Sequence, residues 1–122
     1  MDWSKYAPEF KYEKFTCKCG CGLNNMTESH MDRLIYARRY SGCFYVVRSG
    51  SRCAKHNKEE GGSDTSDHLT GDGTDIEALT SSIRWKIITG LMAAGFTRIG
   101  VGKTFVHAGT GPDNAKQVIW LY

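Results

Sequence analysis

Two stretches of the chain repeat apolar residues at the three- and four-residue spacing of a helix face. The pattern predicts one helix over about residues 28–40 and a second over about 82–94. Thr27 is a suitable N-cap for the first helix and Gly42 a suitable end, while residues 80–82 and Gly95 bound the second. Met31, Leu34, Ile35 and Arg38 recur at helical spacing in the first helix, which we expect to be a core scaffold. The stripe that we expect to face the core in the second helix is Ile83, Ile87, Leu91 and Ala94.

Shorter runs of β-branched and aromatic residues predict strands. They cover residues 43–48, 74–76, 98–101, 104–108 and 117–121, with Gly102-Lys103 as a tight turn between two of them. A short helix is expected over residues 54–60 and a loop over residues 63–72. Helices packed on a small antiparallel sheet make an α+β domain. The aromatic residues Phe10, Tyr12 and Phe15 are expected to pack on this domain, and His30 is expected at the surface.

Length and composition indicate one globular domain spanning residues 1–122. The chain has 122 residues, 40% of them hydrophobic and 24% charged, and no internal repeat or Pro- or Ser-rich linker. No apolar run approaches the roughly 18 residues of a membrane span, so we expect no membrane insertion. The first residues carry no signal-peptide pattern, which predicts a protein made in the cytoplasm without a signal peptide.

The charge is mildly positive, with a formal net charge of +3 and a pI of about 8.6. This balance suits adsorption to anionic cell-wall polymers. It falls short of a nucleic-acid-binding domain, for which a pI above about 9 and clustered Lys and Arg are typical. We therefore expect no nucleic-acid partner.

The strongest candidate chemistry lies in residues 66–75, SDHLTGDGTD, where His68 and Asp75 stand seven positions apart. Gly71 and Gly73 allow the backbone between them to turn tightly. Imidazole nitrogen and carboxylate oxygen are both zinc donors, and a catalytic zinc site takes three protein ligands and keeps one position open. His107, in the apolar run 104–108, is the candidate third ligand.

These motifs resemble the M15 zinc peptidases, the family of D-Ala-D-Ala carboxypeptidases and related phage endolysins. Residues 66–75 are similar to the family motif SxHxxGxAxD, with Gly73 where Ala is usual. Further similar segments, in order along the chain, are residues 15–22 (the N-terminal segment), 49–57 (SGYRCxxHN), 60–62 (VGG), 105–107 (F-[IV]-H) and 118–122 (the closing strand). The resemblance covers nearly the whole chain.

The resemblance implies a fold of the M15 and hedgehog N-terminal type and a zinc ion held by His68, Asp75 and His107. It implies hydrolysis of a peptide bond in bacterial peptidoglycan by zinc-activated water, as in a D,D-carboxypeptidase or an L,D- or D,D-endopeptidase. Arg52 would hold the substrate carboxylate or the developing oxyanion, and Ser66 would support the loop and the substrate. The expected partner is a peptidoglycan stem peptide, bound by a monomer. The protein would act on the cell wall after release from the cell or as part of a virion.

The general base is where this sequence departs from the family pattern. Phage-type relatives read F-[IV]-H-V-D, which places an aspartate two residues after the histidine, and this chain has Gly109 there. Other branches place an acid three residues before the histidine, where this chain has Thr104. The possible substitutes are Asp67, Asp72, Glu77 and Asp113. The departure favours an alternative function, in which an inactive relative binds a cell-wall peptide or another protein.

Five cysteines complete the inventory. Cys17, Cys19 and Cys21 alternate along the chain, while Cys43 and Cys53 stand apart. An odd number argues against a fully paired disulfide framework. Two interpretations remain: a structural zinc held by thiolates, although the common spacing puts two to four residues between paired ligands, or reduced and partly buried thiols.

Overall fold

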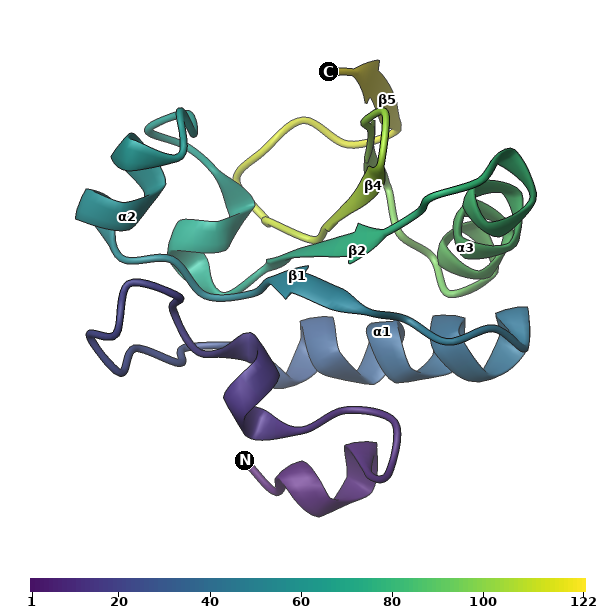
Figure 1. Ribbon diagram of the computed structural model, residues 1–122, viewed down its shortest axis with the longest axis horizontal. Helices are drawn as coiled ribbons and strands as arrows, with labels where there is room; N and C mark the ends of the chain where they lie inside the picture. Colours follow the sequence, from purple (N-terminus) through teal and green to yellow (C-terminus); the bar gives the residue numbers. More distant parts are fainter.

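The computed structural model describes residues 1–122 and has three α-helices and a five-stranded sheet (Figure 1). The helices are α1 (Glu28–Ser41), α2 (Ala54–Glu59) and α3 (Ser81–Ala93). The strands are β1 (Val47–Ser49), β2 (Gly73–Glu77), β3 (Arg98–Val101), β4 (Phe105–Gly109) and β5 (Val118–Leu121). Three short 3-10 turns are η1 (Trp3–Tyr6), η2 (Tyr12–Phe15) and η3 (Asp67–Thr70). The prediction of an α+β domain is confirmed.

The strands are ordered β1-β2-β4-β3-β5, and the sheet is mixed rather than wholly antiparallel. Only β3 and β5 pair in parallel, with Arg98 opposite Val118. The reason lies in the connection after β4. Gly109, at the end of β4, lies opposite Arg98, at the start of β3. The loop of residues 110–117 passes this end of the sheet, so β5 starts beside the start of β3 and runs in the same direction.

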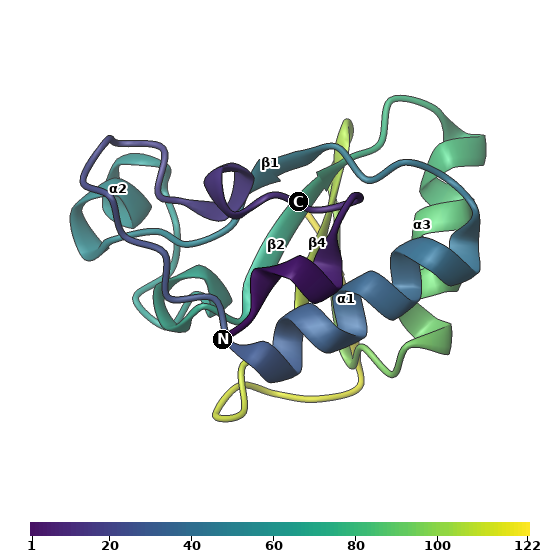
Figure 2. The same cartoon turned by 90° about the horizontal axis from the view of Figure 1, so that it is seen from below.

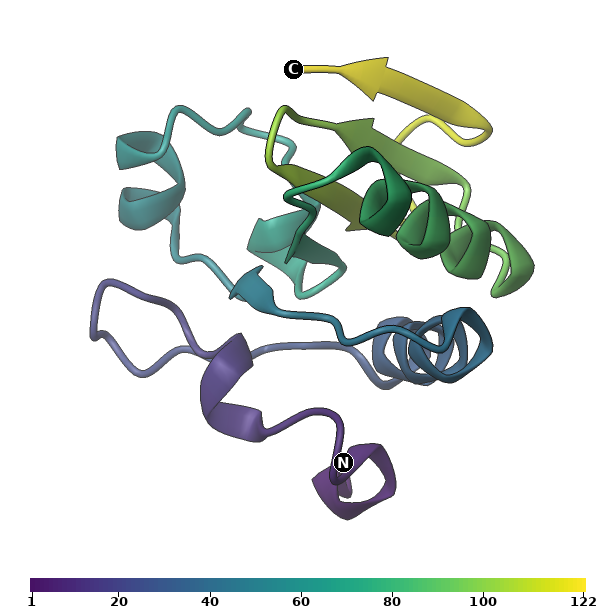
Figure 3. The same ribbon diagram turned by 45° about the vertical axis from the view of Figure 1, so that its right-hand side comes forward.

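The two long helices begin and end where capping predicts. The hydroxyl of Thr27 accepts a hydrogen bond from the N–H of His30 at 3.3 Å, and Gly42 ends α1 in the left-handed region at φ 68°. Thr80 caps α3 in the same manner. Figures 2 and 3 show α1 and α3 lying against each other beside the sheet. Their apolar faces form a core with Ile76 of β2, Val106 of β4 and other buried side chains. No helix is long and apolar enough to span a membrane.

The N-terminal segment packs on this core, as its aromatic residues predict. Tyr6 and Phe15 are fully buried, and Phe10 is nearly so. Tyr12 remains 45% exposed and packs edge-on against Trp3, with ring centroids 5.3 Å apart. The segment therefore covers the side of the domain below β1 and α1 in Figure 1.

The prediction that His30 lies at the surface is wrong. Its side chain is fully buried, with Nδ1 2.7 Å from the hydroxyl of Thr110 and Nε2 2.8 Å from that of Thr74. Because both ring nitrogens have partners, the neutral imidazole can be buried at little cost. Burial lowers the pKa of His30 to about 3.

The first predicted strand is also shorter than expected. β1 pairs with β2 from Val47 onwards, with Val47 opposite Ile76. The five-residue β2 ends at Glu77, whose N–H donates to the carbonyl oxygen of Val46, so residues 43–45 have no strand to pair with. Phe44 is accordingly 82% exposed.

Candidate metal centre

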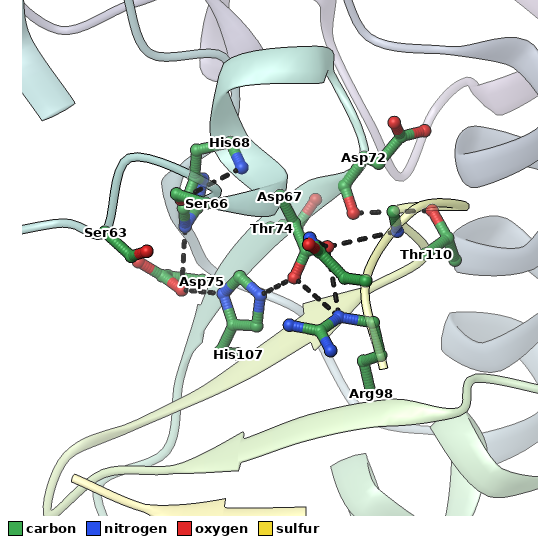
Figure 4. A network of polar contacts seen from close by, with 12 residues as sticks. Ser63, Ser66, Asp67, His68, Asp72, Thr74, Asp75, Arg98, His107 and Thr110 are labelled. Atoms are coloured by element: carbon green, nitrogen blue, oxygen red, sulfur yellow. Dashed lines mark hydrogen bonds and ion pairs between the residues drawn. The ribbon is translucent and has the colours of Figure 1, made fainter. Parts of the chain in front are cut away.

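The three predicted donors, His68, Asp75 and His107, meet on one face of the sheet (Figure 4). Asp75 of β2 lies directly opposite His107 of β4 in the antiparallel ladder. Side chains alternate between faces along a strand, so Val106 enters the core while His107 points to the opposite face. His68 approaches from η3, whose N-terminus Ser66 caps by accepting the N–H of His68 at 3.2 Å. Two strands and one turn thus bring the donors together.

The donor atoms converge tightly. Asp75 Oδ1 lies 3.2 Å from His68 Nε2 and 2.9 Å from His107 Nδ1. One ligand atom from each of the three residues lies within 4.8 Å of the others, and all three residues are buried. Two imidazoles and one carboxylate, converging from three sides, form a donor set that suits zinc.

The outer ring nitrogens fix which nitrogen of each imidazole faces inward. His68 Nδ1 donates to the carbonyl oxygen of Gly50 at 2.7 Å, and His107 Nε2 donates to Asp67 Oδ2 at 2.8 Å. Since a carbonyl and a carboxylate only accept hydrogen bonds, the outer nitrogens carry protons. Metal-binding histidines almost always show this arrangement, in which the second N–H is bound to an acceptor and the ring is held in position. His68 Nε2 and His107 Nδ1 are therefore the ring nitrogens whose lone pairs face Asp75 and could bind a metal ion.

Asp67 is the residue whose role sequence reasoning did not recognise. It is 2% exposed, and its Oδ1 accepts hydrogen bonds from the N–H of Gly111 at 3.1 Å and from Asn114 Nδ2 at 3.0 Å. Arg98 Nε lies 3.1 and 3.2 Å from the two carboxylate oxygens. The carboxylate is thus held by three donors on the side away from His107. No local sequence signal marks these partners, because they come from β3 and the loop after β4.

The carboxylate of Asp67 lies where a side chain at position 109 would lie. A Cβ atom at position 109 would lie 2.3 Å from Asp67 Oδ2 and 3.1 Å from His107 Nε2. A side chain at position 109 would therefore point toward Asp67 and His107. In this protein the carboxylate of Asp67 already fills that space.

Electrostatics reinforce the cluster. Burial opposes ionisation of Asp67 and Asp75, yet the hydrogen bonds from His107 outweigh it and hold the pKa of both carboxyl groups below their usual range. Burial likewise opposes protonation of His107, but hydrogen bonds to the two carboxylates raise its pKa. The two ionised carboxylates therefore favour positive charge at the position between them.

Arg52 lies beside the donor set. Its Nη2 lies 3.0 Å from Asp75 Oδ2 and its Nε donates to the hydroxyl of Ser49 at 3.0 Å. The Arg52 side chain is 14% exposed. Arg52 thus orients Asp75 and also lines the cleft in front of it. Of the neighbouring residues, Asn57 has a packing role, since it is buried and donates to the carbonyl oxygen of Ser63 at 2.9 Å.

The positions of the four possible substitutes for the missing acid show which of them lies near the donors. Asp72 points away from the donors and accepts hydrogen bonds from the hydroxyls of Thr27 and Thr70, both at 2.7 Å. Glu77 pairs with Arg48. Asp113 is exposed in the loop before β5. Of the four, only Asp67 contacts the donor set.

A cleft of roughly 680 Å³ opens in front of the donors. Its walls carry the basic side chains of Lys18, Arg48, Arg52 and Arg98, and its aromatic side chains are Phe105, Trp120 and Tyr122. Acidic side chains in the lining are Glu60, Asp67 and Asp75. The cleft therefore presents several cationic and aromatic side chains in front of the donors.

Comparison with known families supports the same assignment. No curated protein matches the chain. The family model of peptidase M15 matches residues 8–109, a span that includes all three donors, Arg52, Ser66 and Gly109. The match covers most of the chain, and the α+β fold agrees with it. The chain carries a peptidase-type domain and belongs to the peptidase M15 family.

Proposed function

We propose that the protein is a zinc-dependent peptidase that hydrolyses peptide bonds of bacterial peptidoglycan, in the manner of a phage endolysin. The observation that carries the proposal is the fixed orientation of both imidazoles, which aims His68 Nε2 and His107 Nδ1 at Asp75 Oδ1. A zinc ion held by these three groups would supply Lewis-acid activation of water and of the scissile carbonyl.

The side chains around the donors divide the remaining tasks. Arg52 keeps Asp75 in place and presents its other guanidinium N–H groups to the cleft, where they would bind a substrate carboxylate or the developing oxyanion. Ser66 holds the loop that carries His68 and lines the same cleft, within reach of a bound peptide. The basic walls favour the acidic, D-alanine-containing stem peptide as the substrate class.

The proton of the attacking water needs an acceptor. Asp75 belongs to the donor set, and Asp67 is bound to His107 and Arg98. Glu60 is the remaining acidic side chain of the cleft, at the end of α2 with Oε1 3.6 Å from His56 Nε2. Its side chain is 53% exposed and free to turn into the cleft, which makes Glu60 the candidate general base.

A second candidate function is peptide binding without cleavage. It is favoured by Gly109 and Thr104, which leave the two family positions for an acid without a carboxylate. In this case the cleft and the zinc would retain a cell-wall fragment or another protein. Both functions place a monomer on the cell wall after release from the cell or within a virion, with no nucleic acid and no membrane insertion.

The test compares wild type with His68→Ala on one preparation. The peptidase predicts about one zinc ion at this site, clearing of cell walls in a zymogram, and loss of both in the variant. Zinc retention and co-sedimentation with walls, without any clearing by wild type, would establish the binding function instead. Absence of zinc from wild type would overturn both.

A further inference from the structure

A second group of metal donors lies outside the site described above. The sulfur atoms of Cys17, Cys19, Cys21 and Cys53 all lie within 4.8 Å of one another, and none of these cysteines is in a disulfide. Cys17 Sγ lies 3.4 Å from Cys19 Sγ, which lies 3.7 Å from Cys53 Sγ. In tetrahedral zinc with Zn–S bonds of about 2.3 Å, neighbouring sulfur atoms are about 3.8 Å apart. The cluster therefore has the dimensions of a four-thiolate zinc site.

The backbone explains how alternating cysteines converge. The N–H of Cys17 donates to the carbonyl oxygen of Leu23 at 2.8 Å, which closes residues 17–23 into a loop. Gly20 and Gly22 adopt positive φ values of 88° and 84°, which a residue with a side chain rarely adopts. The chain thus curls around one point, and the sulfur atoms of Cys17, Cys19 and Cys21 face it together.

The fourth sulfur comes from the start of α2. The N–H of Ser51 donates to the carbonyl oxygen of Phe15 at 2.9 Å, which places residues 51–53 beside the cysteine loop. Figure 1 shows this loop next to the beginning of α2. Cys53 is the N-cap of that helix. Two backbone N–H groups also point at sulfur, from Cys53 to Cys17 and from His56 to Cys53, each at 3.4 Å. Such N–H donors stabilise metal-bound thiolates.

The fifth cysteine, Cys43, explains why the number of cysteines is odd. Cys43 lies apart from the cluster, with its sulfur 3.5 Å from the hydroxyl of Ser41. Four cysteines therefore form the group and one is a partly buried thiol.

We propose that Cys17, Cys19, Cys21 and Cys53 bind a structural zinc ion, separate from the one assigned to His68, Asp75 and His107. The ion links the N-terminal segment to α2, two elements whose cysteines are more than thirty positions apart in the chain. It also fixes Cys53 directly after Arg52, so it steadies the loop that delivers Arg52 to the cleft. This inference stands independently of the peptidase proposal.

The experiment uses the His68→Ala chain, purified under reducing conditions, so that the first donor set is broken. We expect about one zinc ion per chain with four sulfur neighbours at about 2.3 Å by X-ray absorption. Adding Cys21→Ser should remove this zinc and make the N-terminal segment sensitive to protease. The matched control, Cys43→Ser in the same background, should keep both the zinc and the protection.

Cobalt substitution of the wild-type chain tests the site without altering a cysteine. A thiolate-to-cobalt charge-transfer band with tetrahedral visible bands supports the proposal even where the cysteine variant fails to fold. Absence of these absorption bands would overturn the proposal. So would free reaction of the thiols of Cys17, Cys19, Cys21 and Cys53 with a thiol reagent in the purified chain, or disulfides among these cysteines.

Discussion

Asp67→Asn tests whether the carboxylate on the outer side of His107 controls the donor set. Oδ1 of Asp67 faces the donors of Gly111 and Asn114, and Arg98 lies beside both oxygens. An asparagine must therefore turn its carbonyl oxygen toward these donors, which leaves its NH₂ group facing His107 Nε2. The imidazole can then satisfy that contact only by accepting, with its proton moved to Nδ1. Nδ1 is the atom that points at Asp75, so the proton would occupy the lone pair intended for the metal.

The magnitude follows from the contacts that change. Loss of an outer hydrogen-bond partner of a metal-binding histidine typically costs about 10–100-fold in metal affinity, which is about 1.4–2.8 kcal/mol. Replacing charge-assisted hydrogen bonds around the buried carboxylate should also lower the free energy of unfolding by about 1.5–3 kcal/mol. The two effects separate, because the first appears only when metal is bound.

Zinc affinity is measured by competition with a chromogenic chelator, and the protonation of each ring nitrogen of His107 by ¹⁵N NMR of the zinc-free protein. The matched control is Asp64→Asn, which removes the same charge from an exposed position in the same loop. If Asp67→Asn binds zinc as tightly as the control and keeps the proton on Nε2, then Asp67 does not position His107 and the reasoning is refuted.

The remaining predictions concern other parts of the structure. Gly109→Ala should lower zinc affinity, because its Cβ would displace the Asp67 carboxylate; the same change in an Asp67→Ala background should cost little, and equal costs in both backgrounds would contradict the shared space. Glu60→Gln should reduce kcat on cell-wall substrate by about 10²-fold or more, whereas Glu59→Gln, which is also near His56 but outside the cleft lining, should leave it unchanged. The pKa of His30 is about 3 when folded and near 6.5 when unfolded, so stability from its neutral form is complete above pH 6.5 and falls as the pH drops toward 3, by up to about 1.4 kcal/mol per unit. The free energy of unfolding, measured by urea unfolding at several pH values in this range, should depend less steeply on pH for His30→Gln than for wild type. An equally steep pH dependence in the variant would contradict the burial of a neutral His30. A chelator should lower the Tm of the zinc-loaded protein by mass action, and an unchanged Tm with no metal released would contradict zinc binding.

The local signals in the sequence were sufficient for the elements that depend on neighbouring residues. Helices α1 and α3 follow from apolar periodicity and from caps such as Thr27 and Thr80, because capping uses atoms within the same turn. The placement of His107 on the face opposite Val106 follows from strand alternation alone. The resemblance to the M15 peptidases was also readable, and the family match over residues 8–109 confirms it.

Contacts between segments far apart in the sequence could not be predicted from these local signals. The parallel pairing of β5 depends on where the loop after β4 crosses the end of the sheet, and the burial of His30 depends on hydroxyls contributed by Thr74 and Thr110. Sequence spacing argued against a thiolate site, since single residues separate Cys17, Cys19 and Cys21 where two to four are common.

The sequence by itself thus determined which residues carry the chemistry and which face of each element they occupy, because both depend on residue type and local period. Only the tertiary structure decided what surrounds them. Asp67 stands next to His68 in a motif, yet its function depends on residues of three other segments. Arg98 of β3 and Asn114 of the loop before β5 bind its carboxylate, and Gly109 at the end of β4 leaves the space that this carboxylate fills. Hydrogen bonds and excluded volume act through space, and the chain brings these groups within a few ångströms of one another only when the sheet is assembled.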